Sequence, residues 1–211
     1  MPRAKQRTPE LRDQVLRVAV AMLAADGVAG FTTRKVAEQA RTSPPAVYEL
    51  FGDKAGLVRE IFFEGFRQLR RRFDDLVDSA DPRADLVRVI GTFRVFVREN
   101  PVLAEVMFSR PFADFDPGAL EEEAGSAVRL YIVGHVQRCI DAGVLAGDAT
   151  DIAHVIVSTT QGLAATEHAG WLGRSKASVN RRWALAIEAL LTGLAARDGG
   201  ARAGQASARR R

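Results

Sequence analysis

The side chains best suited to binding an anion fall within residues 31–57. Hydroxyl, guanidinium and ammonium groups all donate hydrogen bonds to phosphate oxygens. The hydroxyls of Thr33 and Tyr48 and the ammonium of Lys54 are suited to phosphate oxygens, whereas Arg34, Thr42 and Ser43 are candidates for contacting bases. Lys54 also follows a helix-starting aspartate, so it lies in a first helical turn, where backbone N–H groups point at anions. The alternatives are a core tyrosine with a hydrated hydroxyl and a solvated surface lysine. The pattern favours a surface that faces a polyanion.

Apolar residues next to these hydroxyls are suited to contacting bases rather than phosphates. Pro44, Pro45 and Ala46 can lie against thymine methyl groups in a DNA groove. Between Ser43 and Phe51 there is no Asn, Gln or Lys to pair with a base edge through two hydrogen bonds. An N-terminal arm could reach the adjacent backbone or minor groove through Arg3, Lys5 and Arg7. The alternative is an arm that never becomes ordered.

A second pair of reactive side chains lies in the C-terminal half. His135 and Cys139 are four residues apart, so on a helix they would share a face as base and nucleophile, or as half of a metal site. No third group is spaced to orient the histidine, so we expect a buried thiol beside a histidine, with no catalysis, metal or cofactor. The alternatives are a helical small-molecule-binding protein or enzyme, and a membrane or protein adaptor that uses the basic C-terminal tail.

The elements that must position these groups are helices. Apolar residues recur at helical spacing along the chain, and strand patterns are almost absent. Glycines, prolines and capping residues divide the chain into eight or nine helices, so the fold class is all-α. We expect them from about Pro9 to Gly27 or Gly30, from Thr32 or Thr33 to Gln39 or Ala40, from Ser43-Pro44, from near Asp53 to Leu76, and over about 83–99, 101–109, 118–143, 149–171 and 176–196.

Composition limits the class of protein. Of the 211 residues, 47% are hydrophobic, enough for a substantial core, but no apolar run reaches the roughly 20 residues of a membrane span. The single cysteine fits a reducing compartment, so we expect a cytoplasmic protein. Net charge is +4 over residues 1–59, −4 over 60–196 and +4 over 197–211. A basic N-terminal portion on an acidic body fits a protein with one polyanion-facing end, although ordinary solvated helix faces would look similar.

The spacing within residues 31–57 resembles a known family. Gly27, Phe31-Thr32-Thr33, Val36-Ala37, Ala40, Ser43, Tyr48, Phe51, Lys54 and Leu57 are similar to the DNA-binding domain of TetR-type transcriptional regulators. The resemblance extends over roughly residues 10–58. It implies a homodimeric repressor that binds double-stranded DNA. Such a protein has a three-helix helix-turn-helix head on a C-terminal bundle of about six helices. We therefore expect domains at 1–8 (flexible basic arm), 9–52 (helix-turn-helix DNA-binding domain), 53–197 (ligand-binding and dimerisation domain) and 198–211 (disordered basic tail).

Two departures from the family pattern fall at the turn and the start of the second helix. This chain has Arg41-Thr42 where the family usually has Gly-Val, and Pro45 where it favours glycine. Either Arg41 takes a left-handed backbone conformation at some cost, or the turn differs. Pro45 is compatible with a helix start, but it lacks an N–H that a phosphate could use.

The run from Asn100 to Pro111 and the later Gln161-Gly162-Leu163-Ala164-Ala165 more weakly resemble one C-terminal branch of the same family, and the resemblance implies a small-molecule effector. Bulky apolar and polar side chains that could bind an apolar effector are Phe93, Phe96, Met107, Phe108, Phe112, Tyr131, His135, Gln161 and His168. A packed core with surface polar groups is the alternative. The last two helices are expected to form the homodimer. They carry a small-residue stripe at Ser158, Thr159, Gly162 and Ala165, and an apolar stripe at Trp183, Ile187, Leu190, Leu191 and Leu194.

Overall fold

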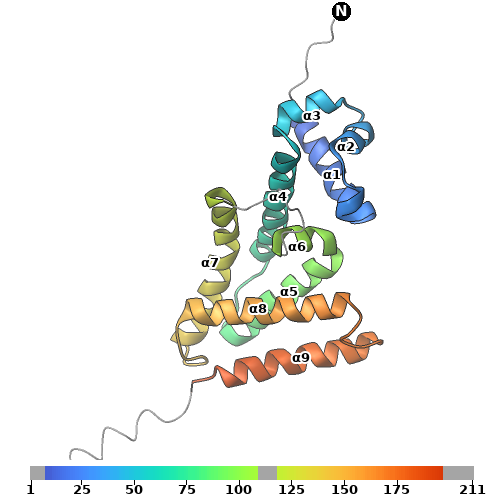
Figure 1. Ribbon diagram of the computed structural model, residues 1–211. Coiled ribbons are helices and arrows are strands. Elements are labelled where there is room, and N and C mark those ends of the chain that lie inside the picture. The colour runs from blue at the N-terminus through green and yellow to red at the C-terminus, as the bar shows by residue number, and fades with distance from the viewer. Residues whose placement is uncertain (1–7, 109–117, 197–211) are drawn as a thin grey trace, which may run out of the picture. The chain divides into compact units, whose positions relative to one another are not determined.

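A computed structural model describes residues 8–108 and 118–196, and within these ranges the regular elements are helices (Figure 1). Their bounds are α1 Pro9–Gly30, α2 Thr33–Gln39, α3 Pro44–Phe51, α4 Lys54–Asp74, α5 Pro82–Glu99, α6 Pro101–Phe108, α7 Ala119–Asp141, α8 Ala149–His168 and α9 Lys176–Gly193. The all-α prediction is confirmed. The predicted tail, Phe112 and nearly all of the predicted arm lie outside the described residues.

The short helices of the N-terminal region begin at capping side chains. Thr32 Oγ1 accepts a hydrogen bond from the Lys35 amide at 3.3 Å, which settles which of the two threonines caps α2. Ser43 Oγ caps α3 through the Ala46 amide at 3.3 Å, and Asp53 Oδ1 caps α4 through the Gly56 amide at 2.7 Å. Each cap satisfies an N–H that has no partner within its helix, so these boundaries are written in the local sequence.

Helices α1, α2 and α3 pack around a small apolar core. Val36 and Ala37 of α2 are fully buried, and Val47 and Phe51 of α3 are buried against them. The small side chain of Ala37 allows the two helices to cross closely. Helix α1 carries a break: Gly27 has φ 66 and ψ −174, so the regular helix ends there and a short turn runs on to Gly30. The outcome is a compact three-helix arrangement at the N-terminus.

Two compact units share the chain. The first comprises residues 1–75 and 93–128, and the second residues 76–92 and 129–211. In the first, α6 packs on both α4 and α1. In the second, α8 and α9 lie side by side, with Ile156 and Leu191 almost fully buried (Figure 1). Within the described ranges, no helix combines the length and apolar character needed to cross a bilayer.

Candidate nucleic-acid interface

The turn between α2 and α3 is built on a left-handed arginine. Arg41 has φ 52, and every other described residue with positive φ is a glycine. Its amide donates to the Glu38 carbonyl at 3.0 Å, and the Thr42 amide donates to the Ala37 carbonyl at 2.9 Å, so the last turn of α2 is closed. Of the two alternatives that the sequence left open, the structure has the strained one: the turn keeps a shape that favours glycine, and an arginine occupies it.

Helix α1 fixes the positions of the turn and of α3. Gln14 Nε2 donates to the carbonyl oxygen of Ala40 at 3.0 Å, directly before the left-handed residue. The guanidinium of Arg12 lies over the ring of Phe51, 5.3 Å from its centroid, and pairs with Glu60 of α4 at 2.6 Å. Because Phe51 is the last residue of α3, these contacts hold both ends of the turn-helix segment. Sequence reasoning missed both residues, since neither contact follows from local spacing.

The outer side of α3 faces solvent. Val47 and Phe51 are buried, whereas Pro45, Tyr48 and Glu49 are exposed. Tyr48 is 48% exposed, which excludes the alternative of a core tyrosine. The exposed side chains follow helical spacing, so one continuous face of α3 is available to a partner outside the chain.

The residues predicted to bind DNA lie on α2, the turn, α3 and the first turn of α4. Five are exposed, namely Arg34, Ser43, Pro45, Tyr48 and Lys54. Thr42, Pro44 and Ala46 are half-buried. Thr33 differs, because only 6% of it is exposed and it belongs to the core beneath α2. The structure thus gathers the predicted residues into one region with mostly accessible side chains.

The aromatic residues predicted to bind a ligand cluster in the first unit. The ring of Phe108 lies 5.7 Å from that of Phe93 and 5.9 Å from that of Phe66. Phe66 in turn lies 4.9 Å from Phe62. Met107 packs against Gly65, where any Cβ would collide with the methionine sulfur. Phe96 is fully buried with the Arg72 guanidinium over its ring. Gly65 and the phenylalanines of α4 therefore allow one aromatic cluster to form in the first unit.

The polar residues predicted to bind a ligand belong to the second unit. The rings of Tyr131 and His135 lie with centroids 4.4 Å apart and their planes tilted by 34°. His135 is buried, and its ring nitrogens lie 2.9 Å from the Tyr131 carbonyl oxygen and 3.0 Å from Asp78 Oδ1. Gln161 is half-buried and His168 is exposed, both on α8. The sequence indicated no third group that could orient the histidine, and this was wrong, because Asp78 does so from 57 residues away.

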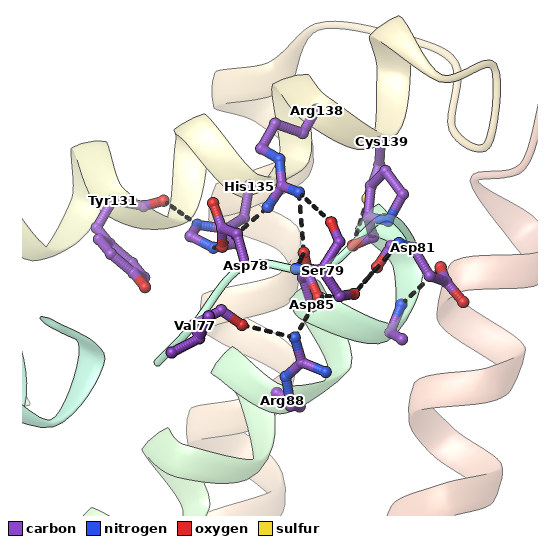
Figure 2. Close-up of polar contacts among 12 residues, drawn as sticks. Val77, Asp78, Ser79, Asp81, Asp85, Arg88, Tyr131, His135, Arg138 and Cys139 are labelled. Atoms are coloured by element: carbon purple, nitrogen blue, oxygen red, sulfur yellow. Dashed lines mark hydrogen bonds and ion pairs between the residues drawn. The ribbon is translucent and has the colours of Figure 1, made fainter. Parts of the chain in front are cut away.

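A polar network in the second unit surrounds a buried carboxylate that the sequence analysis did not single out (Figure 2). Asp85 is 2% exposed and accepts hydrogen bonds from the Ser79 hydroxyl at 2.6 Å, the Ser79 amide at 2.9 Å and Arg138 at 2.9 Å. It also pairs with Arg88. The Ser79 hydroxyl above all, then its amide and the two guanidiniums, outweigh burial and lower the pKa of Asp85 to about 2. Its position on the apolar face of α5 was the available signal.

The thiol of Cys139 is not arranged for nucleophilic chemistry. It is fully buried and donates to the Pro82 carbonyl oxygen at 3.3 Å (Figure 2). Burial is the main reason that its pKa is raised, and a raised pKa disfavours the thiolate that a nucleophile needs. Among the described residues, no group of three or more His, Cys, Asp or Glu side chains could hold a metal ion.

A capped second helix, a closed turn and a third helix with an exposed outer face define a helix-turn-helix DNA-binding protein. Residues 15–61 match the family described as bacterial regulatory proteins, tetR family, and residues 86–190 match the tetracyclin repressor-like C-terminal domain. These two matches cover most of the chain, which therefore belongs to the TetR family of transcriptional regulators. No curated protein matches the chain.

Solved structures share this fold over nearly the whole chain. A protein of unknown function from Rhodococcus sp. RHA1 is 27% identical, with a TM-score of 0.77 over 90% of this chain and 97% of that chain. A bacterial regulatory protein in the tetR family from Rhodococcus RHA1 is 19% identical, with a TM-score of 0.68 over 90% and 100%. The TetR family regulator PfmR from Thermus thermophilus is 17% identical, with a TM-score of 0.65 over 84% and 97%.

Proposed function

We propose that this protein is a homodimeric repressor that binds a palindromic operator through α3 and is released from it by a small, largely apolar effector. Residues 9–52 form the DNA-binding domain and residues 53–197 the effector-binding and dimerisation domain. The protein acts in the cytoplasm, where its operator lies. The observation that carries the proposal is the exposed outer face of α3, with Tyr48 in solvent and Lys54 just beyond it at the start of α4.

On DNA, α3 enters the major groove. The hydroxyls of Thr42, Ser43 and Tyr48 and the cations of Arg34 and Lys54 donate to phosphates, which sets the register of the head. The apolar surface of Pro44, Pro45 and Ala46 lies against thymine methyl groups. Thr33 contributes least, since its side chain is largely enclosed. This division assigns most of the affinity to contacts with the DNA backbone. It thus predicts that the affinity for DNA depends steeply on salt concentration.

The dimer forms through α8 and α9. Three residues of the apolar stripe predicted on α9, Trp183, Ile187 and Leu191, are buried within the chain itself, whereas Leu190 and Leu194 are half-buried. The accessible face carries Val155, Ser158, Gly162 and Ala165 of α8 and Leu185 of α9. Small residues there allow close approach of a second copy. A two-fold axis would place two copies of α3 one DNA turn apart, at about 34–36 Å, which matches a palindrome.

The effector is bound by the aromatic cluster of the first unit, Phe62, Phe66, Phe93 and Phe108 with Met107. Such a lining suits an apolar molecule with few polar groups. Effector and operator bind antagonistically, and by linkage each weakens the affinity for the other by the same factor.

Selection of bound sequences from a random DNA pool tests the proposal. We expect an enriched palindrome, whose binding weakens steeply with salt and is lost or strongly reduced in Tyr48→Ala and Lys54→Ala. Failure of any sequence to be enriched would overturn the operator-binding role. A DNA affinity that no candidate apolar effector alters, across a broad screen, would overturn the effector-responsive part.

A further inference from the structure

Arg41 is an exposed cation held in a costly backbone conformation. Its φ of 52 forces its Cβ close to the following carbonyl, a strain that glycine avoids. The conformation is fixed by the preceding residue: Ala40 is 1% exposed, and its carbonyl oxygen accepts a hydrogen bond from Gln14 at 3.0 Å. Within the described part of the chain, the Arg41 guanidinium has no hydrogen-bond or ion-pair partner. Strain at a position where the side chain has no polar partner inside the protein points to a contact outside it.

The start of α3 lacks two of the backbone N–H groups that a helix N-terminus offers to a phosphate. Pro44 and Pro45 occupy the first two helical positions and carry no N–H. The next amide, of Ala46, is bonded to the Ser43 hydroxyl at 3.3 Å and to the Ser43 carbonyl at 3.0 Å. The Val47 amide donates to the same carbonyl at 3.2 Å. The usual anion-binding capacity of a helix N-terminus is therefore reduced here.

We propose that Arg41 binds a DNA phosphate at the N-terminus of α3, and supplies the donors that the two prolines remove. A guanidinium carries five N–H donors in a fork that matches a phosphate, and Arg41 lies two residues before the cap of α3. This inference rests on the proposed function, since it assumes that α3 faces DNA. It adds a specific contact at a position where the resembling family has glycine.

Arg41→Gly separates this role from a structural one, because the two effects have opposite signs. Glycine relieves the left-handed strain, so the thermal unfolding midpoint should rise by about 2–4 °C. Loss of the guanidinium should weaken operator binding roughly tenfold or more. The slope of log Kd against log salt should become shallower by about 0.9, the change expected for one phosphate contact. Arg41→Lys should keep most of the slope, since it keeps the charge.

Pro45→Ala tests the compensation directly. It restores one N–H at the second position of α3, so in the Arg41→Gly background it should recover part of the lost affinity. In the background that keeps Arg41, Pro45→Ala should increase the operator affinity much less. Circular dichroism of each variant checks that the helix content is unchanged. Arg174→Ala is the matched control: it removes one exposed cation from the connection between α8 and α9, and should leave the salt slope unchanged.

The outcomes distinguish this inference from the proposed function. If Lys54→Ala weakens operator binding while Arg41→Gly changes neither the affinity nor the salt slope, the phosphate contact is wrong and the function stands. If Arg41→Gly lowers both stability and affinity, Arg41 is structural and the inference is overturned. If the wild-type protein selects no DNA sequence, the function and this inference fail together.

Discussion

At the scale of single residues, Asp85 carries an electrostatic cost that its neighbours offset. A carboxylate that is 2% exposed is tolerated only when its oxygens are bonded, and here Ser79, Arg138 and Arg88 all bond to it. Its pKa of about 2 in the folded protein lies below its ordinary value of 3.8, so the folded state favours the charged form. The stabilisation is therefore fully present above about pH 4, and it is lost as the pH falls from there towards about 2.

Asp85→Asn should therefore make the stability of the protein depend less steeply on pH in acid solution. We expect the urea midpoint of the wild-type protein to fall between pH 4 and pH 2 more steeply than that of the variant, because only the wild type takes up this proton on unfolding. Asp13→Asn, at an exposed position on α1, is the control, and its urea midpoint should fall with pH as steeply as that of the wild type. Equal slopes for wild type and Asp85→Asn would contradict the depressed pKa.

Cys139 should behave as an inert core thiol. With its side chain fully buried and its pKa raised, it should react with a thiol reagent far more slowly in the native protein than in urea. Cys139→Ser should leave operator binding unchanged. The rate of labelling, followed by absorbance, gives the first measurement, and DNA titration gives the second. Fast labelling of the native protein would show that the thiol is accessible, and would revive the enzymatic alternative.

At the scale of helices, α1 serves as the frame that orients α3. The Arg12–Glu60 pair and the Arg12–Phe51 contact join three helices at one guanidinium. The side chains of Arg12 and Glu60 are 36% and 21% exposed, so solvent screens the pair and its coupling should be modest.

A double-mutant cycle with Arg12→Ala and Glu60→Gln measures that coupling. We expect a coupling free energy of unfolding of about 0.5–1 kcal/mol. Arg12→Ala alone should cost more, since it also removes the contact with the Phe51 ring. Arg17→Ala, an exposed arginine of the same helix, should be near neutral. Additive effects in the cycle would mean that the pair contributes nothing and that packing alone orients α3.

Local sequence determined the helix boundaries better than it determined the partners of each face. The caps at Ser43 and Asp53 follow from short-range chemistry and were anticipated, and the left-handed turn at Arg41 was one of two alternatives that the sequence left open. The pairing of Asp78 with His135 spans 57 residues, so spacing could not reveal it. Periodicity likewise identified an apolar face on α9, but not that Trp183 is covered by its own chain. The contacts of the predicted DNA-binding and ligand-binding residues stay predictions.

At the scale of the whole molecule, Gly162 offers a test of the dimer that does not disturb the fold. A Cβ at Gly162 meets no atom within 4 Å, and the same holds for Gly91 on α5. Both are exposed helical glycines, so replacement of either by leucine should raise helix stability by up to about 1 kcal/mol.

Only Gly162→Leu should block the close approach of a second copy. We expect it to shift the protein from dimer to monomer in sedimentation velocity, and to weaken operator binding because the two half-sites are no longer bound as a unit. Gly91→Leu should remain dimeric with wild-type affinity. A dimeric Gly162→Leu variant that binds normally would move the interface away from this face of α8.

The first unit draws on two separate stretches of chain, residues 1–75 and 93–128, and this affects how regulators of this kind can be recombined. Helix α6 covers both α1 and α4, and Met107 fills the space above Gly65. A DNA-binding fragment that ends at residue 75 would therefore expose the phenylalanine side chains of α4, and it should be prone to aggregate. A chimeric sensor with a new operator specificity should exchange only the surface of α2, the turn and α3, and keep the host's own α4 and α6 together.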